Sequence, residues 1–225
     1  MKKILNLLHL GKCDYEKALE IQFQLLEKRQ NGEINDTLIL VEHPAVITLG
    51  KSASAENVVA SEIELAHQGI QRYETNRGGD VTYHGEGQIV GYPIVNLIEN
   101  KTKVRTFVEK LEEVFVRILK DFDLKAWGSS KEIGVWVGNE KITAIGLAVK
   151  KGVTMHGFAF NVNTNLDHFQ YIIPCGIREK GVTTLEKLLE KPQDFNRMNQ
   201  RVAEVFSEIF GYQSIIEVTL EEFNL

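Results

Sequence analysis

The pattern of apolar and polar positions alternates between strand-like and helix-like segments along the whole chain. Short runs rich in β-branched and aliphatic residues predict strands. These runs cover residues 4–10, 37–42, 46–49, 70–75, 89–97, 133–137, 141–149 and 153–162. The pair Gly138-Asn139 separates two of the runs. It predicts a tight hairpin between them.

Longer segments with a period of 3.6 residues predict helices over residues 14–30, 61–68, 104–122 and 196–210. In the helix over 14–30, Leu19, Phe23 and Leu26 are expected on one apolar side. The helix over 104–122 has the most continuous apolar face, formed by Phe107, Leu111, Val114, Phe115 and Ile118. Frequent strands and helices together with a hairpin predict an α/β (α+β) fold, a mixed β-sheet flanked by helices.

Composition narrows the class of protein. The chain has 225 residues, 43% of them hydrophobic and 25% charged, with a formal net charge of -5. The absence of a basic excess argues against a nonspecific nucleic-acid binder. No apolar run approaches 18 residues, so we expect no membrane span. Without a repeat or a linker, residues 1–225 are expected to form a single domain, and two cysteines favour the reducing cytoplasm.

A glycine-rich segment over residues 77–88 differs from the scaffold around it. Four glycines alternate there with Arg, Asp, Thr, Tyr, His and Gln side chains. Glycine lets the backbone approach a ligand and leaves N–H groups able to point at a carbonyl or an anion. The segment fits a binding loop or a glycine-rich hairpin turn, and it matches neither a Walker loop nor a dinucleotide-binding fingerprint.

Two further residues are candidates for chemistry. Cys175 lies between Pro174 and Gly176 on a constrained turn, where it is either a nucleophile or a buried inert thiol. Lys141 begins an apolar strand, where its ammonium group is either in solvent or turned into a pocket. In a pocket, the charge would favour a neighbouring thiolate. Small residues on the nearby strands leave room for an aliphatic chain, namely Ala144, Gly146, Gly157 and Ala159.

Two histidines leave three interpretations open. His84 or His156 could pair with Cys175 in catalysis, or all three could bind zinc. The spacing does not match a metal-binding motif, so no metal is expected. A structural hydrogen-bonding role is the third interpretation, and it is favoured for each histidine.

Four motifs in order resemble the lipoyl(octanoyl) transferase family across nearly the whole chain. They are Arg77-Gly-Gly-x-x-Thr-Tyr-His84-Gly-x-Gly-Gln88, Lys141-Ile-x-x-Ile-Gly146, His156-Gly-x-Ala-x-Asn-Val162 and Ile173-Pro-Cys-Gly176. The implied fold is that of the biotin/lipoate protein ligase catalytic domain. The implied activity is transfer of octanoyl from octanoyl-acyl carrier protein to the target lysine of a lipoyl domain. One departure is Glu86, which stands where the family commonly has Pro.

The resemblance also implies roles for matching residues. Cys175 would carry the acyl group as a thioester, and Lys141 would lower the thiol pKa and shuttle the proton. No cofactor would be needed, because amide formation from a thioester runs downhill. The implied acyl pocket is lined by Arg77, Gly78, Gly79, Asp80, Val81, Thr82, Tyr83, His84, Ala144, Ile145, Gly146, Gly157, Phe158 and Ala159.

The implied partners are octanoyl-acyl carrier protein as donor and two kinds of acceptor. The acceptors are the lipoyl domains of 2-oxoacid dehydrogenase acyltransferase subunits and the glycine cleavage H protein. Because such partners are acidic, docking would need a local basic patch, for which the candidates are Arg72, Arg77, Lys101, Lys103 and Arg105. The alternatives are an ATP-dependent lipoate or biotin ligase, an acyl thioesterase, and a non-catalytic module that binds these domains.

Overall fold

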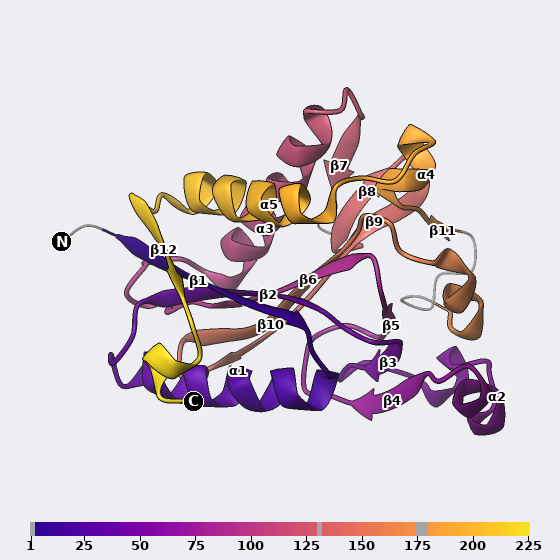
Figure 1. The fold of residues 1–225 in the computed structure, drawn as a ribbon, viewed down its shortest axis with the longest axis horizontal. Coiled ribbons are helices and arrows are strands. Elements are labelled where there is room, and N and C mark those ends of the chain that lie inside the picture. Colours follow the sequence, from indigo (N-terminus) through magenta and orange to yellow (C-terminus); the bar gives the residue numbers. More distant parts are fainter. Residues whose placement is uncertain (1–2, 130–131, 174–179) are drawn as a thin grey trace.

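A computed structural model describes residues 3–129, 132–173 and 180–225 (Figure 1). Its helices are α1 (Tyr15–Gln30), α2 (Glu62–His67), α3 (Val104–Lys120), α4 (Leu185–Leu189) and α5 (Phe195–Phe210). Its strands are β1 (Ile4–Lys12), β2 (Asp36–Glu42), β3 (Val46–Leu49), β4 (Gln71–Glu74), β5 (Val81–His84), β6 (Gln88–Ile94), β7 (Ala126–Gly128), β8 (Gly134–Val137), β9 (Glu140–Lys150), β10 (Val153–Asn161), β11 (Gly181–Val182) and β12 (Ser214–Val218).

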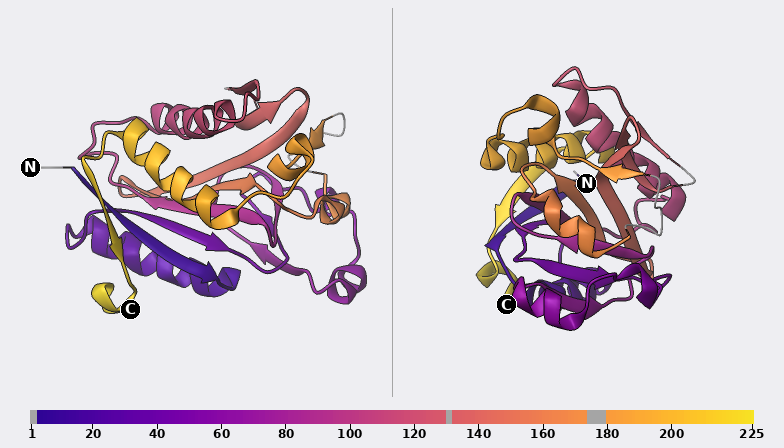
Figure 2. Two further views of the ribbon diagram at one scale, coloured as in Figure 1. Left: turned by 45° about the horizontal axis from the view of Figure 1, so that its top comes forward. Right: turned by 90° about the vertical axis from the view of Figure 1, so that its right-hand side faces the viewer.

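Most of the strands form one mixed sheet with helices on both faces. Its order is β12-β1-β2-β6-β10-β9-β8-β7, with β11 beside β9. Strands β12, β1 and β2 run parallel, and the pairs from β2 to β7 run antiparallel. Helices α3 and α5 lie on one face and α1 on the other, as Figures 1 and 2 show. This architecture confirms the predicted fold class.

Helix α3 carries the apolar face that the sequence predicted. Its buried positions pack with α5 and one face of the sheet. The predicted face residues Phe107, Leu111, Val114, Phe115 and Ile118 are all buried. Burying such a face supplies most of the stability of a helix, because isolated helices of this length are marginal in water.

Helix α1 buries only part of the predicted apolar side. Leu26 is buried and Leu19 packs against the core, but Phe23 is 39% exposed, and the buried stripe is completed by Ala18, Ile21 and Leu25. The prediction was wrong for Phe23 because apolar spacing ignored two polar residues, Gln22 and Arg29, that are buried through their hydrogen-bond partners. The buried stripe therefore follows those partners.

A second, smaller sheet has the order β4-β3-β5. Strand β5 lies inside the glycine-rich segment, which was interpreted as a binding loop or a hairpin turn. Its residues pair with β3, from Val81 with Leu49 to His84 with Val46. The segment is thus a loop over residues 77–80 followed by a strand that fixes the loop's end.

The predicted hairpin is confirmed, with β8 and β9 antiparallel around Gly138. Among the described residues, five short strands and α-helices were not predicted, namely β5, β7, β11, β12 and α4. Among the described residues, no helix is both long enough and apolar enough to cross a bilayer.

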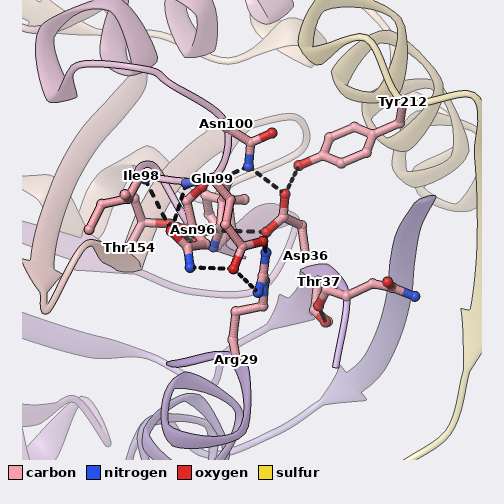
Figure 3. A network of polar contacts seen from close by, with 12 residues as sticks. Arg29, Asp36, Thr37, Asn96, Ile98, Glu99, Asn100, Thr154 and Tyr212 are labelled. Carbon is pink, nitrogen blue, oxygen red and sulfur yellow. Dashed lines mark hydrogen bonds and ion pairs between the residues drawn. The ribbon is translucent and has the colours of Figure 1, made fainter. Parts of the chain in front are cut away.

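A buried charged network ties α1 to the first residue of β2 (Figure 3). Asp36 Oδ1 accepts hydrogen bonds from Arg29 Nε at 2.8 Å and from the Asn96 backbone N–H at 2.9 Å. Asp36 Oδ2 accepts from Asn100 Nδ2 at 2.8 Å and from the Tyr212 hydroxyl at 2.9 Å. All four hydrogen bonds to the carboxylate come from the protein itself, which compensates for its burial.

Candidate functional site

A cavity lies where the loop over residues 77–80 and strand β5 meet β9, β10 and the first residue of α1. Lys141 and most of the predicted pocket residues line this cavity. Those predicted residues are Arg77, Gly79, Asp80, Val81, Thr82, His84, Ala144, Ile145, Gly146, Gly157, Phe158 and Ala159. Three of the four sequence motifs, which are far apart in the chain, therefore meet around one space, and the fourth lies largely outside the described residues.

Two predicted pocket residues lie elsewhere. Tyr83 packs its ring against Phe169 and hydrogen-bonds His168 Nδ1 through its hydroxyl at 2.8 Å. Side chains alternate along β5, so Thr82 and His84 share the face toward the cavity and Tyr83 has the other, while Val81 reaches the cavity from the first position of the strand. Gly78 lines a neighbouring groove that shares Lys141 with the cavity.

Lys141 is turned into the cavity and is only 7% exposed. Its Nζ donates to the Ile133 carbonyl at 3.2 Å and lies 4.8 Å from the centroid of the Trp136 ring. Trp136 is directly opposite in the β8–β9 pairing. The sequence left open whether this ammonium group lies in solvent or in a pocket. In the structure it lies in the pocket.

The loop over residues 77–80 is held down at both sides. The Gly78 N–H donates to the Leu147 carbonyl of β9 at 2.8 Å. A Cβ on Gly146 would lie 2.7 Å from the Gly78 oxygen, so this close approach requires glycine. Arg77 is buried, and its Nη2 donates to the Thr48 carbonyl of β3 at 2.6 Å.

Position 157 also requires glycine, because a neighbouring main-chain carbonyl lies too close for a Cβ atom. A Cβ there would lie 2.1 Å from the Gly91 oxygen on β6. The sequence explained Gly146 and Gly157 as room for an aliphatic chain, but backbone carbonyls already occupy the space that their Cβ atoms would need. Both glycines line the cavity with main-chain atoms, and Ala144 and Ala159 line it with methyl groups.

His84 is held by a relay of side-chain hydrogen bonds. Its Nδ1 lies 2.8 Å from Gln88 Oε1, and Gln88 Nε2 donates to Asn161 Oδ1 at 2.8 Å. Gln88 Nε2 also donates to the Tyr83 carbonyl, and Asn161 Nδ2 donates to the Thr183 carbonyl at 3.1 Å. Because backbone carbonyls only accept, they fix the orientation of both amides.

The relay sets the tautomer of His84. An amide oxygen accepts a hydrogen bond, so Nδ1 carries the proton and Nε2 is the unprotonated ring nitrogen. Burial, together with the neighbouring His43, lowers the pKa of His84 to about 3. The ring stacks on Tyr15 with a centroid distance of 6.2 Å. His84 thus lines the cavity as a neutral hydrogen-bond acceptor.

His156 is also neutral, and its backbone has a left-handed φ of 56°. Its N–H donates to Gln22 Oε1 at 2.8 Å, and its Nε2 lies 2.6 Å from Asn76 Oδ1. Burial and then the charge of Arg77 lower its pKa to about 4. Such a strained conformation persists where surrounding contacts enforce it. Within the described residues, no three His, Cys, Asp or Glu side chains form a metal-binding group.

Cys175 lies outside the described residues, so its predicted role as a nucleophile stays a prediction. Four residues of the cavity wall were not among the predicted pocket residues, namely Tyr15, Tyr92, Ile133 and His156. The sequence had marked His156 for possible chemistry. Tyr15 carried no sequence signal, because it reaches the cavity only through the packing of α1 on the sheet. Gln88 and Asn161 had a usable signal, since each is a polar residue at the end of an apolar strand.

Comparison with known proteins gives the same family along most of the chain. The sequence model described as "Lipoyl protein ligase A/B catalytic domain" matches residues 14–207. An octanoyltransferase of Alkaliphilus metalliredigens is 58% identical over 212 residues, which cover 94% of this chain and 97% of the relative. An octanoyltransferase of Desulforamulus reducens is 51% identical, with 91% of this chain and 90% of the relative covered.

A solved structure with the same fold is a lipoate-protein ligase A bound with ATP. It superposes with a TM-score of 0.77 at 19% identity, covering 100% of this chain and 95% of that one. At this identity the likeness concerns the fold. It agrees with the ligase-like catalytic domain that the resemblance implied.

Proposed function

This chain belongs to the lipoyl protein ligase A/B catalytic domain family and is an acyltransferase, and from that premise we propose its donor, acceptor and mechanism. It takes octanoyl from octanoyl-acyl carrier protein and transfers it to the target lysine of lipoyl domains. Cys175 carries the acyl group between the two partners as a thioester. Lys141 favours the thiolate and exchanges the proton.

One observation carries this proposal. The Lys141 ammonium group is buried in the cavity that the glycine-rich loop and strands β9 and β10 enclose. A lysine with no role at the site would keep its ammonium group in water. In a site with little water, an ammonium group interacts strongly with a nearby thiolate. The largely apolar wall, with Ala144, Ile145, Phe158 and Ala159, suits an aliphatic chain.

The reaction proceeds in two half-reactions. The Cys175 thiolate attacks the donor thioester, the donor's carbon–sulfur bond breaks, and the carrier thiol leaves with a proton. The neutral amine of the acceptor lysine then attacks the enzyme thioester and releases the Cys175 sulfur. Lys141 supplies the proton that the carrier thiol takes and receives the proton that the amine loses. The two half-reactions need no ATP, metal or redox cofactor.

The acceptors that fit this reaction are lipoyl domains of 2-oxoacid dehydrogenase acyltransferase subunits and the glycine cleavage H protein. Nucleic acid and membrane are not expected among the partners. A cytoplasmic location stays a prediction from the small number of cysteines.

Intact-protein mass spectrometry tests the proposal directly. The enzyme is mixed with octanoyl-acyl carrier protein without ATP, and a lipoyl domain is then added. We expect one octanoyl adduct that the lipoyl domain removes. Cys175→Ser should form no thioester adduct, and Lys141→Ala should slow its formation at least about 100-fold, a typical effect of losing a proton-transfer group.

Two matched variants serve as controls. Cys13→Ser removes the other cysteine, and Lys150→Ala removes an exposed lysine at the far end of the same strand. Both should load at the wild-type rate. An adduct lost to water alone would identify a thioesterase. Transfer that requires free octanoate and ATP would identify a ligase. A Cys175→Ala variant that keeps its biological effect would identify a non-catalytic module.

A further inference from the structure

The acceptor nitrogen of His84 has no role in the mechanism described above. Its Nδ1–H donates to Gln88 Oε1. Its Nε2 has a lone pair that can accept a hydrogen bond, and the ring lines the cavity. A neutral acceptor fixed in this way binds groups that present an N–H or O–H. With its pKa lowered to about 3, the ring is a poor base toward an amine but retains its acceptor geometry.

The relay also connects His84 to strand β9, which carries Lys141, and both residues line the cavity. Thr183 accepts from Asn161 through its carbonyl and donates its own N–H to the Lys141 carbonyl at 3.0 Å. Gln88 pairs with Asn161 across strands β6 and β10. The hydrogen bonds thus run unbroken from the main chain of Lys141 to the imidazole of His84. Since His84 and Lys141, the proposed proton-exchanging group, line the same cavity, a group that reacts there comes within the reach of both walls.

Among the groups that react there, the acceptor amine is the one that must be oriented. A primary amine attacks through its lone pair, and its N–H bonds must therefore point away from the thioester carbon. An acceptor atom in the cavity wall that takes one N–H turns the lone pair toward that carbon. A thiolate nucleophile has no N–H and gains nothing from such an atom.

We propose that His84 Nε2 accepts a hydrogen bond from the primary amine of the acceptor lysine as it attacks the Cys175 thioester, with Gln88 and Asn161 as positioning residues. The proposal rests on the proposed function. The carbon–nitrogen bond forms and the carbon–sulfur bond breaks, and the electron pair stays on sulfur. The amine proton passes to that sulfur, directly or through Lys141. His84 keeps its Nδ1 proton and gains none.

The test separates the two half-reactions by rapid quench and mass spectrometry. His84→Asn keeps an N–H near Nδ1 for Gln88 and removes the acceptor at Nε2. His84→Gln reaches the Nε2 position with an amide oxygen. For His84→Asn we expect discharge by the lipoyl domain to be slowed about 30-fold more than loading from octanoyl-acyl carrier protein, as for one misplaced nucleophile. His84→Gln should recover part of that loss.

A second nucleophile sharpens the test. Discharge of the loaded His84→Asn enzyme by free pantetheine, a thiol, should be slowed about 30-fold less than discharge by the lipoyl domain, each relative to wild type. An exposed histidine on α2, His67, provides the control substitution His67→Asn, which should change neither step. Thermal unfolding of each variant checks its fold. Should His84→Asn unfold, Gln88→Ala releases the ring and carries the same amine-specific expectation.

Equal slowing of both half-reactions, or of amine and thiol discharge alike, would overturn the role of His84 and leave it structural. Unchanged discharge by the lipoyl domain would overturn it as well. A wild-type enzyme that never forms an acyl adduct would instead contradict the proposed function.

Discussion

Two buried polar networks lie near opposite ends of helix α1, and they differ in how their buried polar groups are compensated. Near the end of the helix, Arg29 pairs with Asp36, whose two oxygens take four hydrogen bonds from protein groups. At its start, Tyr15 stacks on His84, which the amides of Gln88 and Asn161 hold neutral. The first network is charged, and protein groups meet both oxygens of its buried carboxylate. The second is neutral and borders a cavity.

The difference separates scaffold from site. A buried charge is tolerated when every lone pair is met inside the protein, and such a network only fixes the arrangement of elements. A neutral network that keeps a ring nitrogen at a cavity wall has capacity left for a ligand. We therefore expect damage to the first network to affect stability, and damage to the second to affect chemistry.

The largest expected effect comes from opening the charged network. Asp36→Ala leaves Arg29 Nε and the Tyr212 hydroxyl without their buried acceptor, with Glu99 as the remaining partner of the guanidinium, and should cost about 3–5 kcal/mol in the free energy of unfolding. Urea denaturation measures this loss. The exposed pair Arg105–Glu109 provides the control, because Glu109→Ala should cost about 0.5 kcal/mol or less. Similar losses for both variants would contradict the role of burial.

The second prediction concerns acid. Burial is the largest cause that lowers the pKa of His43 and His156 to about 4 and of His84 to about 3, so all three are neutral in the folded protein. Unfolding lets each take up a proton below about pH 6.5. Their stabilisation is present above that pH and is lost as the pH falls toward about 4. At pH 5 each should cost about 2 kcal/mol relative to neutral pH.

The slope of unfolding free energy against pH measures this effect. Between pH 6.5 and 5, His43→Gln should lower the proton uptake on unfolding by about one proton relative to wild type. Glutamine at that position can still donate to the Cys13 carbonyl and accept from the Tyr92 hydroxyl. An unchanged slope would mean that His43 binds its proton equally in both states.

Part of the fold could be predicted from the sequence because local periodicity reports local burial. The α3 face and the β8–β9 hairpin depend on residues close together in the chain, and both predictions are confirmed. The α1 side was predicted correctly for Leu26 and wrongly for Phe23, because Arg29 is buried by its ion pair with Asp36, which hydropathy does not register. Strand β5 was missed because its order depends on pairing with β3, about 35 residues earlier.

The motifs predicted most residues of the site, but they did not predict how those residues are arranged. The motifs marked the loop, β9 and β10, but the hydrogen bond from Gly78 to Leu147 that joins them spans 69 positions. No spacing rule indicates that Tyr83 faces Phe169 while His84 faces the cavity. Register between strands decides that, and register is set by tertiary packing.

A third, smaller effect tests whether charge or location decides the role of a buried group. Glu112 of α3 is a buried carboxylate near the cavity, and its Oε1 accepts from the backbone N–H of Gly134 at 3.0 Å and of Ser129 at 3.3 Å. Burial raises its pKa. The adjoining Ile133 carbonyl accepts from Lys141 Nζ. Glu112→Ala should cost about 1.5 kcal/mol through lost hydrogen bonds.

The same substitution should also slow acyl loading, because the carbonyl that positions the Lys141 ammonium group loses its support. Glu112→Gln keeps an oxygen for both N–H groups and should recover most of the stability and the loading rate. Urea denaturation and the mass-spectrometric loading assay measure the two effects. Loss of stability in Glu112→Ala with unchanged loading would assign Glu112 to the scaffold.

The smallest effect is expected outside both networks. There, surface charges influence how the acyl carrier protein binds and have little effect on the stability of the fold. The groove beside the cavity extends from Lys141 to Val104 and Val108 at the start of α3, close in sequence to the exposed Lys101 and Lys103. Reversing both charges should raise KM for octanoyl-acyl carrier protein about fivefold at low salt, with the difference vanishing as salt screens it. Stability should change by about 0.5 kcal/mol or less. Lys191→Glu, outside that groove, is the control, and kinetics equal to wild type at low salt would remove this patch as a docking surface.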